Sequence, residues 1–263
     1  MKRVGPILLA LPLVAAACGS TREPPLATPT ISTAAPKLKP TPKPVPAAPA
    51  CTPTLQALGS SRRAYVGFAT RGAVAFDRPG GRVVARFAAK NVNDYPTAFG
   101  IVGVVKRANC SLLWYRVQLP IRPNGSVGYV RASSLHVYAV ASRIVVDVAA
   151  KRLTLFIRGK RRLTATVAVG SPATPTPTGR YYVNQRLVPS DISGPYGPGA
   201  VGVSAFSNVL TGWAQGGPIA IHGTNEPWSI GHAVSNGCIR LPNATLRTVF
   251  SLAGTGTPVI IRA

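Results

Sequence analysis

The chain has 263 residues and a mass of 27.4 kDa, enough for one large domain or two small ones with hydrophobic cores. It carries 30 Lys and Arg against only 6 Asp and Glu, and the acids are far apart in the sequence. This scarcity argues against a two-carboxylate glycosidase, a calcium loop and a carboxylate-rich magnesium site. The net charge of +24 is spread evenly, which favours attraction to an anionic matrix such as an acidic cell wall over nucleic-acid binding.

The N-terminus has the pattern of an export signal. Lys2 and Arg3 precede an apolar run over residues 4–17, which is too short to span a bilayer. The small residues before Cys18 resemble the bacterial lipoprotein cleavage box, and this resemblance implies a lipidated Cys18 that anchors the protein to a membrane outside the cytoplasm. An ordinary signal peptide cut near Ala17 is the alternative.

The composition then divides the chain into four parts. After the signal peptide at residues 1–18, residues 19–50 are rich in proline and cannot bury a core, so we expect a disordered linker. Residues 51–140 and 141–263 are rich in β-branched residues broken by turn residues, and we expect each to form a β-rich module. The whole protein is therefore predicted to be mainly β, with one or two short helices.

In the first module, short strands are expected at regular spacing. They are Ala64–Ala69, Arg82–Phe87, Phe99–Val105 and Leu113–Leu119. A turn at Asn124-Gly125 follows, and the hairpin around it resembles the end of a bacterial SH3-like domain. That resemblance implies a small barrel, in which we interpret Trp114 and Tyr129 as core residues and not as part of a ligand groove.

Three cysteines besides Cys18 remain, and no CxxC pair is present, which disfavours a zinc site. Because an exported protein meets an oxidising compartment, Cys51 and Cys110 are candidates for a disulfide, with two free thiols as the alternative. The remaining cysteine, Cys238, lies in the second module.

Strands and one helix are expected in the second module. The strands are Ile144–Val148, Arg152–Ile157, Thr164–Val169, Arg180–Gln185 and Pro258–Ile261. The basic run over residues 158–162 is expected at a hairpin tip, and a helix over Asn243–Leu252 is expected to begin with Asn243 as its N-cap. Nothing resembles a phosphate loop or a Rossmann glycine pattern.

One stretch of the second module contains candidate catalytic residues. His222 ends a β-branched segment before a Gly turn, and Cys238 follows the turn Ser-Asn-Gly. A thiol near a histidine can become a nucleophile, because imidazole accepts the thiol proton. Few carboxylates are available to orient His222, which favours a backbone carbonyl in that role. The amides of Gly237 and Cys238 are candidate oxyanion donors.

These residues resemble the catalytic motif of the L,D-transpeptidase family, the YkuD domain. The turn Thr-Pro-Thr-Pro-Thr-Gly at residues 174–179 matches the same family. The resemblance implies a β-sandwich-like domain in which Cys238 is the acyl-forming nucleophile, His222 its base and the Gly223 carbonyl the group that orients His222. It further implies substrate contacts from Arg240, Asn236, Thr224 and Trp228, with no metal and no cofactor.

The chain departs from the family pattern at Asn236, where the family has a histidine. Asn can hold a turn but cannot carry a proton, and His232 in the spacer is interpreted as an exposed loop residue. The implied reaction is crosslinking of peptidoglycan stem peptides with loss of a terminal D-Ala. The alternatives are an L,D-carboxypeptidase, which uses water as the acceptor, and a non-catalytic cell-wall-binding lipoprotein.

Overall fold

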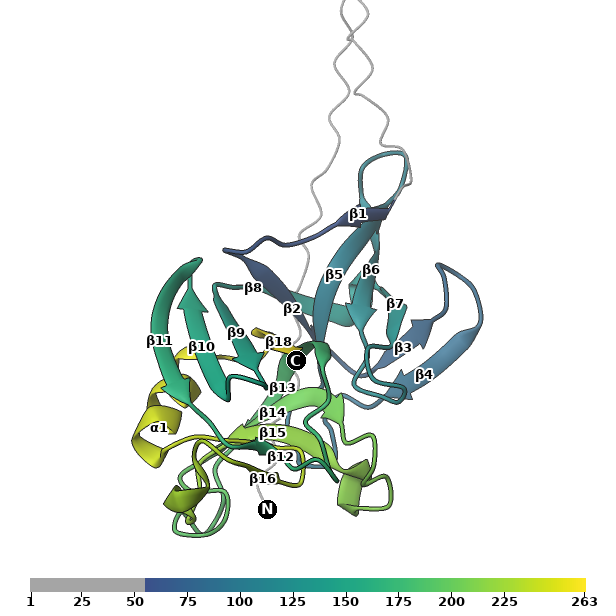
Figure 1. Cartoon of the computed structure of the whole chain (residues 1–263). Coiled ribbons are helices and arrows are strands. Elements are labelled where there is room, and N and C mark those ends of the chain that lie inside the picture. The colour runs from purple at the N-terminus through teal and green to yellow at the C-terminus, as the bar shows by residue number, and fades with distance from the viewer. Residues whose placement is uncertain (1–54) are drawn as a thin grey trace, which may run out of the picture. The chain divides into compact units, whose positions relative to one another are not determined.

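The computed structural model describes residues 55–263, which belong to one compact unit, Ala48–Ala263. These residues are mainly β-structure with a single α-helix, as the sequence predicts (Figure 1). The signal sequence, the proline-rich linker, Cys18 and Cys51 lie outside the described residues, so the predictions about them stay predictions.

The first part of the described chain forms an eight-stranded antiparallel sheet, which we call the N-terminal β module (residues 55–140). Its strands follow the order β4-β3-β7-β6-β5-β2-β8, and β1 pairs with β5. They are β1 (Leu55–Ala57), β2 (Ala64–Ala69), β3 (Ala73–Phe76), β4 (Val83–Phe87), β5 (Ala98–Lys106), β6 (Leu112–Gln118), β7 (Val127–Arg131) and β8 (Leu135–Val140). The SH3-like character of this module stays a prediction.

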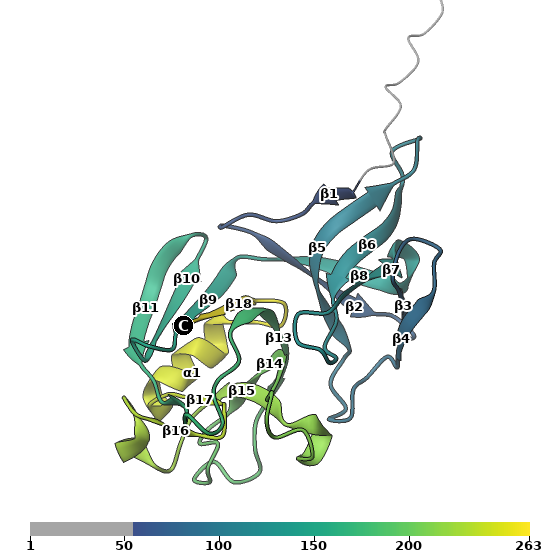
Figure 2. The ribbon, with the colours of Figure 1, turned by 45° about the vertical axis from the view of Figure 1, so that its right-hand side comes forward.

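Strands β5 and β6, which lie side by side in both views, supply much of the core of this module (Figure 2). Phe99 of β5 and Val117 of β6 are fully buried, and the ring of Phe87 meets that of Phe99 edge to face at 5.0 Å. Burying aromatic and β-branched side chains on one face is the main stabilising term for such a sheet. This core contains no residue of the second module.

The remainder of the chain forms the C-terminal β module (residues 141–263), whose main sheet has the order β11-β10-β9-β18-β13-β14-β15-β17. Its strands are β9 (Ser142–Asp147), β10 (Arg152–Ile157), β11 (Lys160–Thr166), β13 (Gly179–Leu187), β14 (Ala200–Phe206), β15 (Pro218–His222), β17 (Ile239–Arg240) and β18 (Pro258–Arg262). The short strands β12 (Val169–Gly170) and β16 (Ala233–Ser235) pair separately. Three single turns of 3₁₀-helix, η1 (Ala132–Ser134), η2 (Ala214–Gly216) and η3 (Pro227–Ser229), complete the described elements.

Helix α1 (Asn243–Leu252) covers the predicted range, but its N-cap differs from the prediction. The capping residue is Pro242, and no side chain caps the helix. The side chain of Asn243 instead accepts a hydrogen bond from the N–H of Thr224 at 2.8 Å. Leu246 and Val249 of α1 are fully buried in the core of this module. No helix within residues 55–263 combines the length and the apolar character that a membrane span needs.

The hairpin between β10 and β11 is tighter than the sequence suggested. Arg158 and Gly159 have φ angles of 51° and 81° and form the turn alone, with Ile157 paired to Lys160. Lys160–Arg162 therefore belong to β11 and not to the hairpin tip. A two-residue turn with positive φ at both positions matches the twist of the strands it joins.

Hydrogen bonds and close packing join the two modules. Tyr182 of β13 is fully buried, and its hydroxyl donates to the carbonyl of Ala98 at 2.8 Å. Burial raises the pKa of Tyr182. A Cβ at Gly100 would lie 2.9 Å from the Tyr182 ring, so this contact requires a glycine. The hydroxyls of Tyr95 and Thr255 lie 2.9 Å apart and add a second link.

Cys110 is disulfide-bonded and has a left-handed φ of 65°. It follows β5 in the turn that leads to β6. Because the predicted partner Cys51 lies outside the described residues, the Cys51–Cys110 pairing stays a prediction.

Candidate active site

His222 and Cys238 are brought together by two neighbouring parallel strands. Strand β15 pairs with β17 in the register Ile221 to Ile239. Both isoleucines are fully buried in the core, so the flanking residues His222 and Cys238 face the other side of the sheet. The parallel pairing thus places His222, which ends β15, and Cys238, which directly precedes β17, on a common face of the sheet.

The imidazole of His222 is held by backbone and by one aromatic ring. Its Nδ1 lies 2.6 Å from the carbonyl oxygen of Gly223. A carbonyl can only accept, so Nδ1 carries the proton and Nε2 keeps a free lone pair. The ring of Tyr196 meets the imidazole edge to face with centroids 5.0 Å apart. This arrangement fixes the tautomer that a general base requires.

Burial keeps both reactive groups neutral. It lowers the pKa of His222 from 6.5 to about 4; the Gly223 carbonyl opposes this effect, and the charge of Arg240 adds to it. Burial also raises the pKa of the Cys238 thiol, against the N–H of Ala220 and the charge of Arg240. The resting site is therefore a neutral thiol and a neutral imidazole. The Sγ of Cys238 lies 3.9 Å from the carbonyl oxygen of Pro218.

Ser235 holds the turn that carries the thiol. Its hydroxyl donates to the carbonyl of Cys238 at 2.6 Å and accepts from the N–H of Gly237 at 3.1 Å. The Gly237 φ of 109° is a left-handed conformation that favours glycine. Because its N–H already serves this turn, the oxyanion role predicted for Gly237 would require that bond to be shared or broken, and the Cys238 N–H is the simpler donor.

Two threonines of the segment 174–179 donate hydrogen bonds to the turn that carries Cys238. Thr176 is buried; its hydroxyl donates to the carbonyl of Gly237 at 2.9 Å and accepts from the N–H of Gly170 at 2.8 Å. Thr174 donates to the carbonyl of Ser235 at 2.9 Å. Pro175, which lies between these two threonines, restricts the backbone, so both hydroxyls reach the turn with little loss of entropy.

Cys238 opens into a cleft of about 580 Å³. Its lining includes Asn236 and, from beside His222, Tyr196; the substrate contact predicted for Asn236 stays a prediction. Trp213 and Gln215 line it as well, from the segment between β14 and β15. No charged side chain is among the lining residues, although the protein carries a net charge of +24. The cleft is therefore suited to uncharged parts of a ligand.

Three residues predicted to contact substrate are not among the residues that line the cleft. Arg240 pairs through its guanidinium with the carboxylate of Glu226. Thr224 is buried, and its hydroxyl accepts from the N–H of Glu226 at 2.9 Å, so it stabilises the turn after His222. Trp228 is 64% exposed on η3 and is not among the residues lining the cleft, where Trp213 lies instead. His232 is exposed, as expected of a loop residue.

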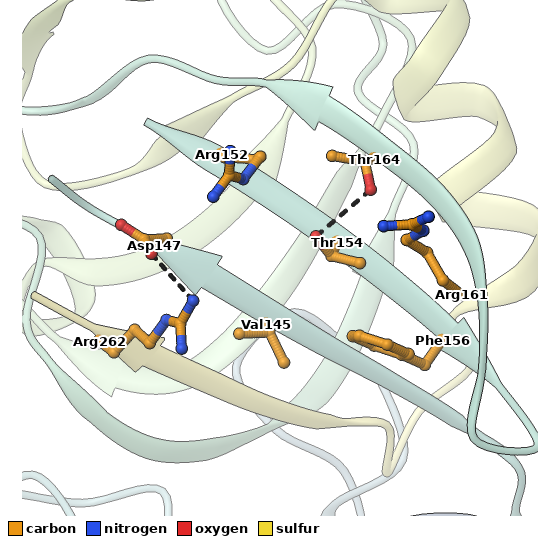
Figure 3. A pocket seen from close by; sticks show the side chains of 8 residues that line it. All are labelled: Val145, Asp147, Arg152, Thr154, Phe156, Arg161, Thr164 and Arg262. Atoms are coloured by element: carbon orange, nitrogen blue, oxygen red, sulfur yellow. Dashed lines mark hydrogen bonds and ion pairs between the residues drawn. The ribbon is translucent and has the colours of Figure 1, made fainter. Parts of the chain in front are cut away.

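A second hollow, of about 540 Å³, lies on the outer face of β9, β10, β11 and β18 (Figure 3). Its lining includes Asp147, 3.0 Å from Arg262, and the hydroxyl pair Thr154–Thr164, but no cysteine or histidine. Within residues 55–263, no group of three His, Cys, Asp or Glu side chains is placed to hold a metal ion. Of the two candidate catalytic side chains, Cys238 lines the first cleft, whereas His222 lines neither hollow and packs against Tyr196, which does line the cleft.

Sequence reasoning missed several residues of this site. Tyr196, Ser235, Thr176 and Asn243 all act on the His222 or Cys238 turn, and two of them, Tyr196 and Thr176, are far from both in the sequence. Ser235 could have been identified, because a serine three residues before a turn cysteine commonly bonds the backbone of that turn. The others required the tertiary structure.

Comparison with known proteins gives a consistent family. The family model described as the L,D-transpeptidase catalytic domain, YkuD, matches residues 141–261. The YkuD protein of Bacillus subtilis (strain 168), named as an L,D-transpeptidase, is 38% identical over 124 residues, which cover 47% of this chain and 68% of that protein. Its namesake in Bacillus licheniformis is 36% identical over 119 residues, which cover 45% of this chain and 64% of that protein.

Among solved structures, an L,D-transpeptidase from Mycobacterium smegmatis is similar at 21% identity, with a TM-score of 0.37, over 54% of this chain and 76% of that one. The family assignment relies on the sequence matches. With more than two thirds of the Bacillus subtilis relative covered at 38% identity, the chain belongs to the L,D-transpeptidase family of the YkuD domain.

Proposed function

We propose that this protein crosslinks peptidoglycan stem peptides as an L,D-transpeptidase, through a thioester on Cys238. The observation that carries the proposal is the imidazole of His222, whose Nδ1 is held by the Gly223 carbonyl and whose Nε2 is free, on the same sheet face as Cys238. A positioned base beside a thiol is what nucleophilic acyl transfer needs.

The reaction then runs in two halves. As the donor peptide enters the cleft, Nε2 of His222 takes the thiol proton, and the Cys238 sulfur attacks the carbonyl carbon of the third stem residue. The Cys238 N–H supports the developing oxyanion. The tetrahedral intermediate collapses to a thioester, and the leaving amine of the terminal D-Ala takes the proton from His222.

The second half returns the enzyme to its starting state. The side-chain amine of a second stem peptide attacks the thioester carbonyl and gives up a proton to His222. Collapse forms the new amide bond and releases the Cys238 thiolate, which recovers that proton. His222 is neutral at neutral pH, so its Nε2 can accept a proton in each half of the reaction.

The test is to incubate the protein with a disaccharide-tetrapeptide and analyse the products by mass spectrometry. We expect a crosslinked dimer that has lost one D-Ala, no product with Cys238→Ala, and one carbapenem adduct per chain in the wild type only. A tripeptide without a dimer would instead assign the L,D-carboxypeptidase activity. A wild type that gives neither product nor adduct would favour a non-catalytic cell-wall-binding protein.

We further propose that the enzyme works outside the cytoplasm, held at the membrane by a lipid on Cys18, with the proline-rich residues 19–50 as a linker. The apolar run before Cys18 and the small residues beside it support this placement. Radiolabelled palmitate should enter the full-length protein in cells and be absent from Cys18→Ala. Equal label in both proteins would contradict the anchor.

A further inference from the structure

One wall of the cleft is the segment 207–217, which joins β14 to β15. It closes on itself, because the N–H of Ser207 donates to the carbonyl of Gly217 at 2.8 Å. Six of its residues line the cleft that holds Cys238: Ser207, Leu210, Trp213, Ala214, Gln215 and Gly217. The position of this segment therefore determines the width of the cleft.

Two side chains of the N-terminal β module hold the base of this segment. Arg122 donates to the carbonyl of Ser207 at 2.9 Å and to that of Gly216 at 2.5 Å, so one guanidinium ties both ends together. Asn124 accepts from the N–H of Phe206 at 2.9 Å and donates to the carbonyl of the same residue at 2.7 Å. Both residues come from the turn between β6 and β7.

A third residue of that module enters the cleft itself. Asn93, from the loop between β4 and β5, is a lining residue. Its amide donates to Gln185 at 3.1 Å and to Gln215 at 3.3 Å, and accepts from Gln215 at 3.0 Å. Three carboxamides from both modules thus meet at the cleft. Carboxamides both donate and accept, which matches the alternating groups of a peptide backbone.

We propose that the N-terminal β module contributes residues to the substrate-binding site. Arg122 and Asn124 are positioning residues that hold the wall 207–217. Asn93 exchanges its 3.3 Å hydrogen bond to Gln215 for one to a backbone carbonyl of the peptide donor. The identity of that donor rests on the proposed transpeptidase function. The uncharged lining of the cleft supports an amide contact, since nothing in it would pair with a charged ligand group.

The wall is tested by hydrogen exchange on the full chain. In Arg122→Ala, amides of residues 206–217 should exchange at least about tenfold faster, because a hydrogen bond from a charged group is lost at each end of the segment. Asn124→Ala should speed hydrogen exchange chiefly at the Phe206 amide, because that N–H donates to the Asn124 side chain. Arg86→Ala is the matched control: Arg86 lies exposed on β4 of the same module, so its loss should leave the segment as in the wild type.

Asn93 is tested by steady-state kinetics with the disaccharide-tetrapeptide. Asn93→Ala should raise KM about tenfold with kcat within about twofold, because the lost contact is made equally in ground and transition states. Asn109→Ala, whose side chain bonds only to nearby Ser111, should leave both constants unchanged. A general loss of stability would lower kcat and the melting temperature instead.

Equal exchange in Arg122→Ala and Arg86→Ala, or an unchanged KM in Asn93→Ala, would overturn the proposal. If the wild type does not turn over the tetrapeptide, the transpeptidase assignment fails. The exchange comparison then still decides whether the N-terminal β module holds the wall, because that readout needs no substrate.

Discussion

The buried imidazole of His222 gives a quantitative prediction about pH. Its pKa is lowered from 6.5 to about 4 in the folded protein, chiefly by burial. Because the folded-state pKa lies below the unfolded one, the stability from keeping His222 neutral is present above pH 6.5 and is lost as the pH falls toward 4. The difference corresponds to about 3 kcal/mol of free energy of unfolding.

Acylation of Cys238 should follow the same ionisation. Only neutral His222 can take the thiol proton, so the rate should stay near its plateau down to about pH 5 and fall with a midpoint near pH 4. The measurement is the single-turnover rate of carbapenem adduct formation across pH, followed by intact mass. Denaturant unfolding over the same range should show the matching loss of stability, and His222→Ala should remove that part of the loss.

The control is His232→Ala, because His232 is exposed and should leave both pH profiles unchanged. A midpoint near pH 6.5 in the wild type would refute the reasoning, since 6.5 is the ordinary value for an unburied imidazole. A wild-type midpoint near pH 4 that persists in His222→Ala, with an unreduced rate, would show that another group is the base.

Two further substitutions test the turn that carries Cys238. Thr176→Val removes the hydrogen bonds to Gly237 and Gly170 at nearly constant side-chain volume. It should lower the free energy of unfolding by about 1–3 kcal/mol and slow the acylation of Cys238. Thr164→Val is the control for both measurements, because Thr164 is exposed on β11. Asn236→His restores the family residue and should change the acylation rate by less than about tenfold, because His222 already occupies the position of the base. A hundredfold acceleration would instead mark the natural protein as an impaired enzyme.

Much of the strand pattern could be predicted from the sequence, and the exceptions have physical causes. Ala64–Ala69 and Arg152–Ile157 were predicted with the observed bounds, because turn residues flank a short run of strand formers. In the basic run after Ile157, Arg158 lies in the hairpin turn as predicted, but Lys160–Arg162 belong to β11. Charge indicated exposure, and exposed arginines occur on the outer face of a strand as well as in turns.

The site was predictable only where its residues lie close together in the sequence. The motif around His222 and Cys238 lies within a short stretch, and one carbonyl next to the histidine accounts for its orientation. The error at Asn243 shows the limit. Asn is favoured at a helix N-cap, but here its amide bonds to the N–H of Thr224, a long-range contact that competes with capping.

The glycine after His222 is required by space and not by backbone conformation. A Cβ at Gly223 would lie 2.3 Å from Oδ1 of Asn243, 2.7 Å from Cδ of Pro198 and 3.1 Å from Cα of Gly197. Two separate segments, the pair Gly197-Pro198 and the start of α1 at Asn243, exclude a side chain here, so no single compensating change elsewhere could make room for one. The carbonyl that orients the imidazole therefore belongs to a glycine that no single substitution can replace. A backbone carbonyl could be supplied by any residue, but packing allows only glycine at this position.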